Sequence, residues 1–361
     1  NDLGACSYNH DFPFVRGLRI IPTDDFGLVN SLDPTIVWYY YDTSMNSVQS
    51  AYEIEVGTDN DWTNAEMWRI GPVWSSSDTI HYNGLGLVQH RTYFARVRVN
   101  DGSNWGDWAQ TSFRIRLSAG ATTIRVPEQL ASIQSAINIA RQWDTILVSP
   151  GEYEEDLTFD TTSLKLFSAG AESPTTVSSL TLRNAGAKHI EVVGFTIRNV
   201  DGNGVFVDSG NTFSATNCTI ESSANGGVSS YYSDVALANC VIRDHTQGRG
   251  VYQEYGTLTI LGCQVSGNNV DTMEEWYTRY GAGIQLVEVT SAVVKGNFIA
   301  GNWGGSGAAI SLLSVSQATI SHNLIADNVT CDVWGGAVYI QTCNYVTIFN
   351  NTVCSNTQYC S

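Results

Sequence analysis

Six copies of one short pattern recur between Val205 and Thr352, and they constrain the fold of this chain more than any other feature. Each copy places a glycine-rich turn before a short apolar stretch, in the order GNGVFV, GGVSSY, GRGVYQ, GAGIQL, GAAISL and GGAVYI. From Val205 to Val338, the equivalent positions follow one another at spacings of 23, 23, 33, 26 and 28 residues. Periods of this length indicate a solenoid, and apolar residues two apart within each unit predict strands.

Two columns of residues keep the same place in successive repeats. The first lies two residues before an apolar position and reads Phe195, Cys218, Cys240, Cys263, Asn297, Asn323 and Asn351. The second lies three residues after that apolar position and reads Ser223, His245, Asn268, Asn302, Asn328 and Asn356. Stacked asparagine side chains can bond to one another and to the backbone of the bends. We therefore interpret both columns, including His245, as structural and as part of the inside of the solenoid.

The segment before the repeats has the pattern of a capping element. In IRVPEQLASIQSAINIARQWDTILVSPGEYEEDLTF (Ile124–Phe159), apolar residues at spacings of 3, 4 and 3 predict an amphipathic helix. These residues are Leu130, Ile133, Ile137 and Ala140, and the turn PGEYEE follows at Pro150–Glu155. The segment resembles the opening of right-handed parallel β-helix proteins of the pectin-lyase-like superfamily. The resemblance implies a right-handed parallel β-helix over residues 124–361 with an N-terminal capping helix. The superfamily holds lyases, hydrolases, epimerases, phage spikes and surface proteins, so it implies no single activity.

Residues 28–118 contain short strand-like segments separated by turns, which is typical of a β-sandwich. Tyr52, Ile54 and Val56, for example, alternate with two glutamates. The region resembles a fibronectin type III domain. Trp38 matches the core tryptophan of that family, and Tyr93 matches its strand-F tyrosine. The resemblance implies a spacer or docking module, and we assign it no chemistry.

The expected fold is therefore all-β, with a fibronectin type III-like sandwich before the β-helix. Residues 1–27 are expected to form an N-terminal arm or a first strand. Residues 119–123 (AGATT) are small and are expected to form a short linker between the two domains.

Charge narrows the range of partners. The 361 residues include 18 Lys and Arg against 35 Asp and Glu, a formal net charge of −17. This balance argues against nucleic acid and anionic membranes as partners. No apolar run is long enough to span a membrane. Few lysines, together with many Asn, Thr, Ser, Tyr and Trp residues, favour a secreted, extracellular or cell-surface protein.

Eight cysteines are present, and the three in the first column are expected to be buried thiols. Cys331 and Cys360 fall at nearly the same place one coil apart, so they are candidates for a disulfide, with Cys354 as a competing partner. The remaining cysteines are odd in number, which makes Cys6 a candidate for a bond to another chain.

One coil is longer than its neighbours because it contains the insertion SGNNVDTMEEWYTRYGAG (Ser266–Gly283). Paired carboxylates can act as acid and base in glycoside cleavage. The candidate catalytic residues are accordingly Asp271, Glu274, Glu275 and Arg279. However, the aspartate pairs of pectin hydrolases, the DPHE motif of alginate epimerases and the arginine motif of pectate lyases are missing.

Aromatic residues gather in this insertion and in bends of adjacent coils. Aromatic rings stack on the faces of sugars, so these residues are candidates for glycan binding or for an interface. They are Trp276, Tyr277, Tyr280, Tyr231, Tyr232, Tyr252, Trp303 and Trp334. Asp244, His245, Arg249 and Glu254 lie near them in the repeats. A solvated loop with no site is the alternative interpretation.

Two loops of the first domain contain carboxylates that could bind Ca²⁺, namely Asp59 and Asp61 in GTDNDWT and Asp101 and Asp107 in NDGSNWGD. Turn chemistry explains the same residues. No other metal or cofactor is indicated.

Two functional hypotheses follow from these observations. The first is a secreted or cell-surface structural or adhesive β-helix protein that self-assembles end to end through an uncapped last coil and contacts glycans. The missing catalytic motifs, the odd cysteine and a last coil without a recognisable cap motivate it. The alternative is an extracellular polysaccharide lyase or glycoside hydrolase of the pectin-lyase-like superfamily.

Overall fold

The computed structural model describes residues 12–24, 27–44, 47–117, 120–160, 162–170, 173–183, 186–270, 280–331 and 336–359. The chain divides into two compact units, Asn1–Gly120 and Ala121–Ser361. The boundary between them falls within the expected linker at residues 119–123.

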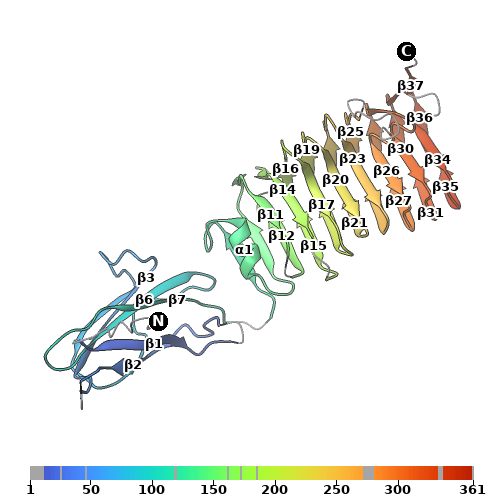
Figure 1. The fold of residues 1–361 in the computed structure, drawn as a ribbon. Coiled ribbons are helices and arrows are strands. Elements are labelled where there is room, and N and C mark those ends of the chain that lie inside the picture. Colours follow the sequence, from blue (N-terminus) through green and yellow to red (C-terminus); the bar gives the residue numbers. More distant parts are fainter. Residues whose placement is uncertain are drawn as a thin grey trace, which may run out of the picture. The chain divides into compact units, whose positions relative to one another are not determined.

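The first domain is a β-sandwich of two antiparallel sheets in the described residues (Figure 1). One sheet has the strand order β1 (Phe14–Ile21), β2 (Thr35–Tyr41), β5 (Thr79–His81). The other has the order β4 (Trp68–Val73), β3 (Ala51–Gly57), β6 (Thr92–Asn100), β7 (Ala109–Arg114). Every second residue of β6 from Tyr93 to Val99 is fully buried, because successive side chains of a strand point to opposite faces.

Trp38 and Tyr93 take the positions that the sequence predicts. Trp38 is fully buried, and its indole Nε1 donates to Oε1 of Gln49 at 2.9 Å. Tyr93 is also fully buried, and its hydroxyl accepts the backbone N–H of Val88 at 2.8 Å. A strand-F tyrosine bonded to backbone a few residues upstream is a hallmark of immunoglobulin-like sandwiches. The expected all-β sandwich is confirmed.

The described part of residues 1–27 is not a separate arm. Phe14–Ile21 forms β1, which pairs antiparallel with β2, and its Val15 and Ile20 side chains are buried in the sandwich core. For these residues, the first-strand interpretation holds because an apolar face on β1 completes the core.

In the second domain, helix α1 (Ile133–Ile139) covers the first coil. Ser132 is its N-cap, and the carboxylate of Glu155 in the PGEYEE turn accepts the N–H groups of Ile133 and Gln134 at 2.9 and 2.8 Å. These donors have no partner within the helix, and the carboxylate lies at the positive end of the helix dipole. The side chain of Ile137 is buried against the core, as the apolar stripe predicts.

Three parallel sheets wind along the second domain, and we number them in the order in which the chain visits them (Figure 1). The strands of sheet I are β8 (Thr123–Val126), β9 (Thr145–Val148), β12 (Leu164–Ser168), β15 (His189–Val193), β18 (Thr212–Thr216), β21 (Asp234–Ala238), β24 (Thr257–Leu261), β27 (Ser291–Lys295), β31 (Gln317–Ser321) and β35 (Tyr345–Phe349). The strands of sheet II are β10 (Gly151–Glu152), β13 (Thr175–Val177), β16 (Phe195–Ile197), β19 (Thr219–Glu221), β22 (Val241–Arg243), β25 (Gln264–Ser266), β28 (Phe298–Ala300), β32 (Leu324–Ala326) and β36 (Thr352–Cys354).

Sheet III contains the strands that follow the glycine-rich turns. They are β11 (Asp156–Thr158), β14 (Ser179–Leu182), β17 (Asn203–Val207), β20 (Gly226–Tyr231), β23 (Arg249–Glu254), β26 (Ile284–Val287), β30 (Ile310–Leu313) and β34 (Val338–Gln341). A short extra sheet at the corner after sheet II is formed by β29 (Trp303–Gly304), β33 (Val329–Thr330) and β37 (Thr357–Gln358). Val205, Val228, Val251, Ile284, Ile310 and Val338 pair in succession, so the sequence register is confirmed.

Each coil bends at three corners. From β15 of sheet I, β19 of sheet II and β20 of sheet III onward, the residue directly after each strand of these sheets adopts a left-handed conformation with φ between 51° and 79°. After sheet I these residues are Gly194, Asn217, Asn239, Gly262, Gly296, His322 and Asn350. After sheet II they are Ser222, Asp244, Gly267, Gly301, Asp327 and Ser355, and after sheet III they are Tyr232, Tyr255, Glu288, Ser314 and Thr342. Glycine and asparagine suit this conformation best, which explains their frequency at the first corner.

The second sequence column forms a hydrogen-bonded ladder inside the corner after sheet II. The backbone N–H of Asn268 donates to Oδ1 of Asn302 at 3.2 Å, and that of Asn302 donates to Oδ1 of Asn328 at 3.1 Å. Nδ2 of Asn302 donates to the carbonyl of Val265 at 3.1 Å. At the other end, the N–H of Ser223 donates to Nδ1 of a fully buried histidine, His245, at 3.0 Å. The structural interpretation of this column is confirmed.

The first sequence column lies inside the corner between sheets I and II. Cys218, Cys240 and Cys263 are 1%, 1% and 2% exposed. The N–H of Cys240 donates to Sγ of Cys263 at 3.3 Å, and the N–H of Cys263 donates to Oδ1 of Asn297 at 2.7 Å. Thiols and amides therefore occupy equivalent positions, because both accept the same inward backbone N–H.

Among the described residues, the longest α-helix has seven residues, so none reaches the length that a bilayer crossing requires.

Replacing Asn302 with leucine keeps the size of the side chain but removes its hydrogen bonds to Asn268, Val265 and Asn328. Each buried polar group left unpaired costs about 1–3 kcal/mol, so the free energy of unfolding should fall by about 3 kcal/mol or more. Chemical denaturation measures the change, with the exposed helix residue Asn138→Leu as control. Equal stability of the two variants would contradict the ladder's role.

His245 gives the ladder a pH dependence. Desolvation by burial lowers the pKa of its imidazole from 6.5 to about 4. Below pH 6.5 the unfolded histidine binds a proton that the folded one does not bind until about pH 4, so stability is lost as pH falls through this window. The free energy of unfolding should be about 2 kcal/mol lower at pH 5 than at pH 7 from this group alone.

The variant His245→Asn keeps an acceptor for Ser223 but does not titrate. Denaturant titrations of both proteins at pH 7 and pH 5 should show a smaller pH difference for the variant. An unchanged difference would show that other groups dominate.

Candidate functional site

The outer side of sheet III gathers aromatic and charged side chains over β17, β20 and β23. Register places Phe206 beside Ser229 and Ser229 beside Tyr252, while Tyr231 lies beside Glu254. These residues point outward because their neighbours in each strand are buried in the core. We define the aromatic face as Phe206, Tyr231 and Tyr252 with the flanking side chains of Arg183, Arg249 and Glu254.

Three rings form a continuous row on this face. The ring of Tyr231 lies 5.7 Å from that of Phe206 and 5.5 Å from that of Tyr252, between centroids. Ser229 lies between Phe206 and Tyr252 in the sheet. Because serine is small, the ring of Tyr231 fits over it and contacts both neighbouring rings. Tilted rings at these distances attract one another, which holds the row in place.

A guanidinium group lies over each end of the row. Arg183 is 4.7 Å from the centroid of Phe206, and Arg249 is 5.3 Å from that of Tyr252. Both distances are within the range of cation–π attraction. Arg183 is exposed, whereas Arg249 is half-buried. Desolvation by burial lowers the pKa of Arg249 to about 10, so it stays charged at neutral pH.

Glu254 completes the face. The hydroxyl of Tyr252 donates to its Oε2 at 2.6 Å. Burial and then this hydrogen bond raise the pKa of Tyr252, and burial with the charge of Glu254 raises that of Tyr231. Both phenols are therefore protonated hydrogen-bond donors at any physiological pH, beside a carboxylate acceptor and a fixed cation.

The face is covered farther along the sheet. The next outward residues, Gln285 and Ser311, are 4% and 0% exposed. A Cβ on Gly281 would come within 2.8 Å of Gln285, so this segment lies directly over it. Nε of Arg249 donates to the carbonyl of Tyr280 at 3.0 Å, and the ring of Tyr280 stacks 5.7 Å from that of Tyr339. The end of the insertion thus bounds the aromatic face at β23.

Of the sequence candidates, Tyr231, Tyr252 and Tyr280 come together around Arg249. Tyr232 does not join them, because its left-handed corner position turns it away, and it stacks on Tyr255 at 4.3 Å between centroids. Trp303 lies in β29, with Tyr359 as its aromatic neighbour at 6.3 Å. Asp244 is a corner residue and His245 a ladder residue.

The other aromatic and catalytic candidates lie outside the described residues. These are Asp271, Glu274, Glu275, Trp276, Tyr277, Arg279 and Trp334. Their roles stay predictions.

The carboxylates proposed for Ca²⁺ support their own turns. Oδ1 of Asp59 accepts the N–H of Asp61 at 2.8 Å, and Oδ1 of Asp101 accepts those of Ser103 and Asn104 at 2.7 Å. In the described part of the chain, no three acidic, histidine or cysteine side chains, Asp107 included, are placed to hold a metal ion.

The disulfide candidates are only partly described. Sγ of Cys331 lies 3.2 Å from the carbonyl of Gly304, while Cys6 and Cys360 lie outside the described residues. Both pairings stay predictions.

A charged cluster on the outer side of sheet II is self-contained. Glu221 lies between Arg198 and Arg243 in three successive coils and bonds to both, at 2.5 and 2.7 Å. The hydrogen bond from Arg198 is the main reason that the pKa of Glu221 is lowered. Asp244 lies 3.6 Å from Arg243, so two carboxylates face two guanidinium groups and the cluster is an ion-pair row.

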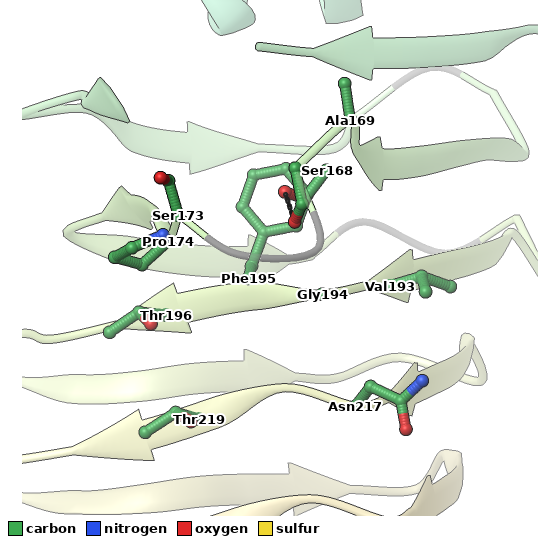
Figure 2. Close-up of a pocket in the computed structure, with 11 residues that line it drawn as sticks. Ser168, Ala169, Ser173, Pro174, Val193, Gly194, Phe195, Thr196, Asn217 and Thr219 are labelled. Atoms are coloured by element: carbon green, nitrogen blue, oxygen red, sulfur yellow. Dashed lines mark hydrogen bonds between the residues drawn. The ribbon is translucent and has the colours of Figure 1, made fainter. Parts of the chain in front are cut away.

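A groove of about 580 Å³ runs over the corner between sheets I and II in the early coils. Figure 2 shows its lining by Ser168, Thr196, Asn217 and Thr219 around Gly194. Among the described residues, its lining carries hydroxyl and amide groups that can offer hydrogen bonds.

Sequence reasoning missed Phe206 and Arg183 of the aromatic face. Phe206 occupies the same offset in GNGVFV that Tyr252 occupies in GRGVYQ, so the repeat alignment contains the signal. Arg183 follows β14 outside the aligned repeats and gives no such signal.

Two family models match the chain. The model "Right handed beta helix region" matches residues 180–361. The model "Rha78A-like, N-terminal immunoglobulin domain" matches residues 17–143. The sandwich expected from its resemblance to fibronectin type III domains is therefore similar to an immunoglobulin-like domain of the Rha78A type. A search of curated proteins found no match.

Solved structures give distant similarities. An α-L-rhamnosidase from Dictyoglumus thermophilum is 24% identical with a TM-score of 0.27, and the match covers 30% of this chain and 13% of that one. Geobacillus virus E2 ORF18 is 12% identical with a TM-score of 0.29, covering 73% and 68%. A family 28 exopolygalacturonase from Yersinia enterocolitica is 9% identical with a TM-score of 0.18, covering 97% and 99%.

Proposed function

Because the chain belongs to the right-handed β-helix family, we propose that it is a glycan-binding protein whose aromatic face contacts an extended carbohydrate chain. We place it outside the cell or on its surface, as the composition favours.

The observation that carries the proposal is the row of three rings with a cation over each end. Phe206, Tyr231 and Tyr252 come from three successive coils, so the row follows the solenoid axis and suits a linear ligand. Rings offer flat apolar surfaces to the C–H faces of sugars, while Glu254, Arg249 and the phenols can bond to hydroxyl or carboxylate groups.

The fixed positions of the aromatic side chains favour a binding site over a solvated surface with no function. Tyr231 packs between two rings and Tyr252 is held by Glu254 and Arg249. Side chains fixed before binding lose little conformational entropy when a ligand arrives.

Affinity electrophoresis or calorimetry against neutral and uronate-containing polysaccharides tests this proposal. The change Tyr231→Ala breaks the row at its centre and should weaken binding at least about tenfold, or about 1.4 kcal/mol. Tyr345→Ala is the matched control, since Tyr345 is 79% exposed on β35 of sheet I. Failure of the parent to bind any polysaccharide, or equal binding by Tyr231→Ala, would refute the assignment.

A polysaccharide lyase or glycoside hydrolase is the second candidate function. It is favoured by the cluster of Arg249, Tyr252 and Glu254, because a lowered pKa of Arg249 and a raised pKa of Tyr252 are typical of functional sites. The cluster borders the insertion that contains Glu274 and Glu275.

Product release from the same polysaccharides decides between binding and catalysis. For an enzyme, the variants Glu254→Gln, Glu274→Gln and Glu275→Gln should include at least one that binds as the parent but releases no product. If the parent protein releases no product, the enzyme hypothesis is refuted and only the binding proposal remains. End-to-end assembly through the last coil stays a separate prediction.

A further inference from the structure

The outer side of the four-stranded sheet in the first domain carries a row of paired charges. Register places Glu53 opposite Arg98 and Glu55 opposite both Arg96 and Arg69. Arg96 and Arg98 each approach their glutamate to 2.5 Å, and Arg69 approaches Glu55 to 2.7 Å. Glu55 is only 6% exposed, so its charge depends on these partners.

Three tryptophans stack on this row. The guanidinium of Arg96 lies 4.5 Å from the ring of Trp62 and 4.3 Å from that of Trp108. The guanidinium of Arg98 lies 4.8 Å from Trp108 and 5.0 Å from Trp105. Rings and cations therefore alternate across the sheet. We call Trp62, Trp105 and Trp108 with Arg96 and Arg98 the tryptophan–arginine ladder.

The loops that supply the tryptophans are fixed by their own residues. Asp61 accepts the N–H and hydroxyl of Thr63 at 3.1 and 2.7 Å beside Trp62, and Asp101 caps the turn before Trp105. Gly106 lies against the carbonyl of Pro13 so closely that a Cβ would come within 1.7 Å. The carboxylates that resemble Ca²⁺ ligands in sequence thus position the ladder.

A cavity of about 210 Å³ opens beside the ladder, lined by Glu53, Glu55, Arg69, Ile70, Gly71 and Trp108. Gly71 has φ of 127°, and a Cβ there would come within 2.6 Å of Glu53. The Glu53 side chain therefore lies directly against the backbone of Gly71, and the indole of Trp108 forms another wall. Cavities for drug-sized ligands have about 300–1,000 Å³, so this one suits a single small ring.

The polar groups of the cavity still have bonding capacity. Arg98 uses Oε2 of Glu53 through both Nε and Nη2, and Oε1 of Glu53 accepts no hydrogen bond from the described residues. Arg69 is 58% exposed and bonds to Glu55 through Nε, so its terminal nitrogens reach solvent. An acceptor, donors and an indole face surround one ring-sized space.

We propose that this cavity is a carbohydrate subsite that binds one neutral sugar residue, with Trp108 against the ring and Glu53 and Arg69 bonded to its hydroxyls. Each of the three guanidinium groups is already bonded to one of the two carboxylates, and hydroxyl groups can bond to such paired ions without separating them. Its residues all belong to the first domain, whereas those of the aromatic face belong to the second.

Saturation-transfer NMR on the full chain tests this subsite, with methyl glycosides of neutral hexoses and 6-deoxyhexoses as probes. Measurements in the Tyr231→Ala background remove the aromatic face, so the two sites are judged separately. We expect binding that Trp108→Ala weakens at least about tenfold and Arg69→Ala about threefold. Trp74→Ala is the matched control because Trp74 is 72% exposed in the same domain and outside the cavity lining.

Thermal unfolding of each variant separates loss of binding from loss of fold. Where Trp108→Ala unfolds the sandwich, Trp108→Phe and Arg69→Ala carry the comparison. No binding of any probe by the Tyr231→Ala protein, or binding by Arg69→Ala equal to that of the Trp74→Ala control, would overturn the proposal.

Discussion

The backbone N–H groups at the inner corners are the constraint on which the β-helix depends. At each corner the chain leaves one strand and enters the next, so these donors cannot join a regular sheet and cannot reach water. Asn268, Asn302 and Asn328 solve the problem by accepting the N–H of the preceding coil. An unpaired buried donor costs about 1–3 kcal/mol, and the cost would recur in every coil. The second column therefore holds side chains that accept this N–H, including Ser223, His245 and Asn356, whereas outward positions carry no such requirement.

The difference between inward and outward positions explains where binding sites can form. Sheet III stacks its outward positions at the spacing of neighbouring strands, so aromatic residues in successive coils meet automatically. Phe206 and Tyr252 share one column, and Tyr231 reaches between them from the next. The first domain reaches a similar arrangement differently, since loops lay Trp62 and Trp108 across a guanidinium. In both domains, guanidinium groups lie within cation–π distance of aromatic rings.

Sequence alone predicts the inside of this molecule better than its outside. Cys218, Asn302 and their columns were assigned correctly because a solenoid forces equal environments at equal offsets. Outward positions obey no such rule. Tyr231 and Tyr232 are adjacent in sequence, yet one joins the aromatic face and the other leaves it, because the corner after β20 places Tyr232 at φ 51°. A left-handed residue at that place is visible only once three strands per coil are known.

The tryptophan–arginine ladder shows a second limit of sequence reasoning. Asp59, Asp61 and Asp101 supply oxygen atoms of the kind that bind Ca²⁺, and nothing in the sequence distinguishes that role from turn support. The pairing of Glu55 with Arg96 and Arg69 depends on the register of strands far apart in the chain. Only that register shows that the glutamates of the sheet pair with arginines. The aspartates of the loops then support the turns that place the tryptophans over these arginines. A surface that is charged in sequence thus becomes, through pairing, a nearly neutral one with aromatic walls.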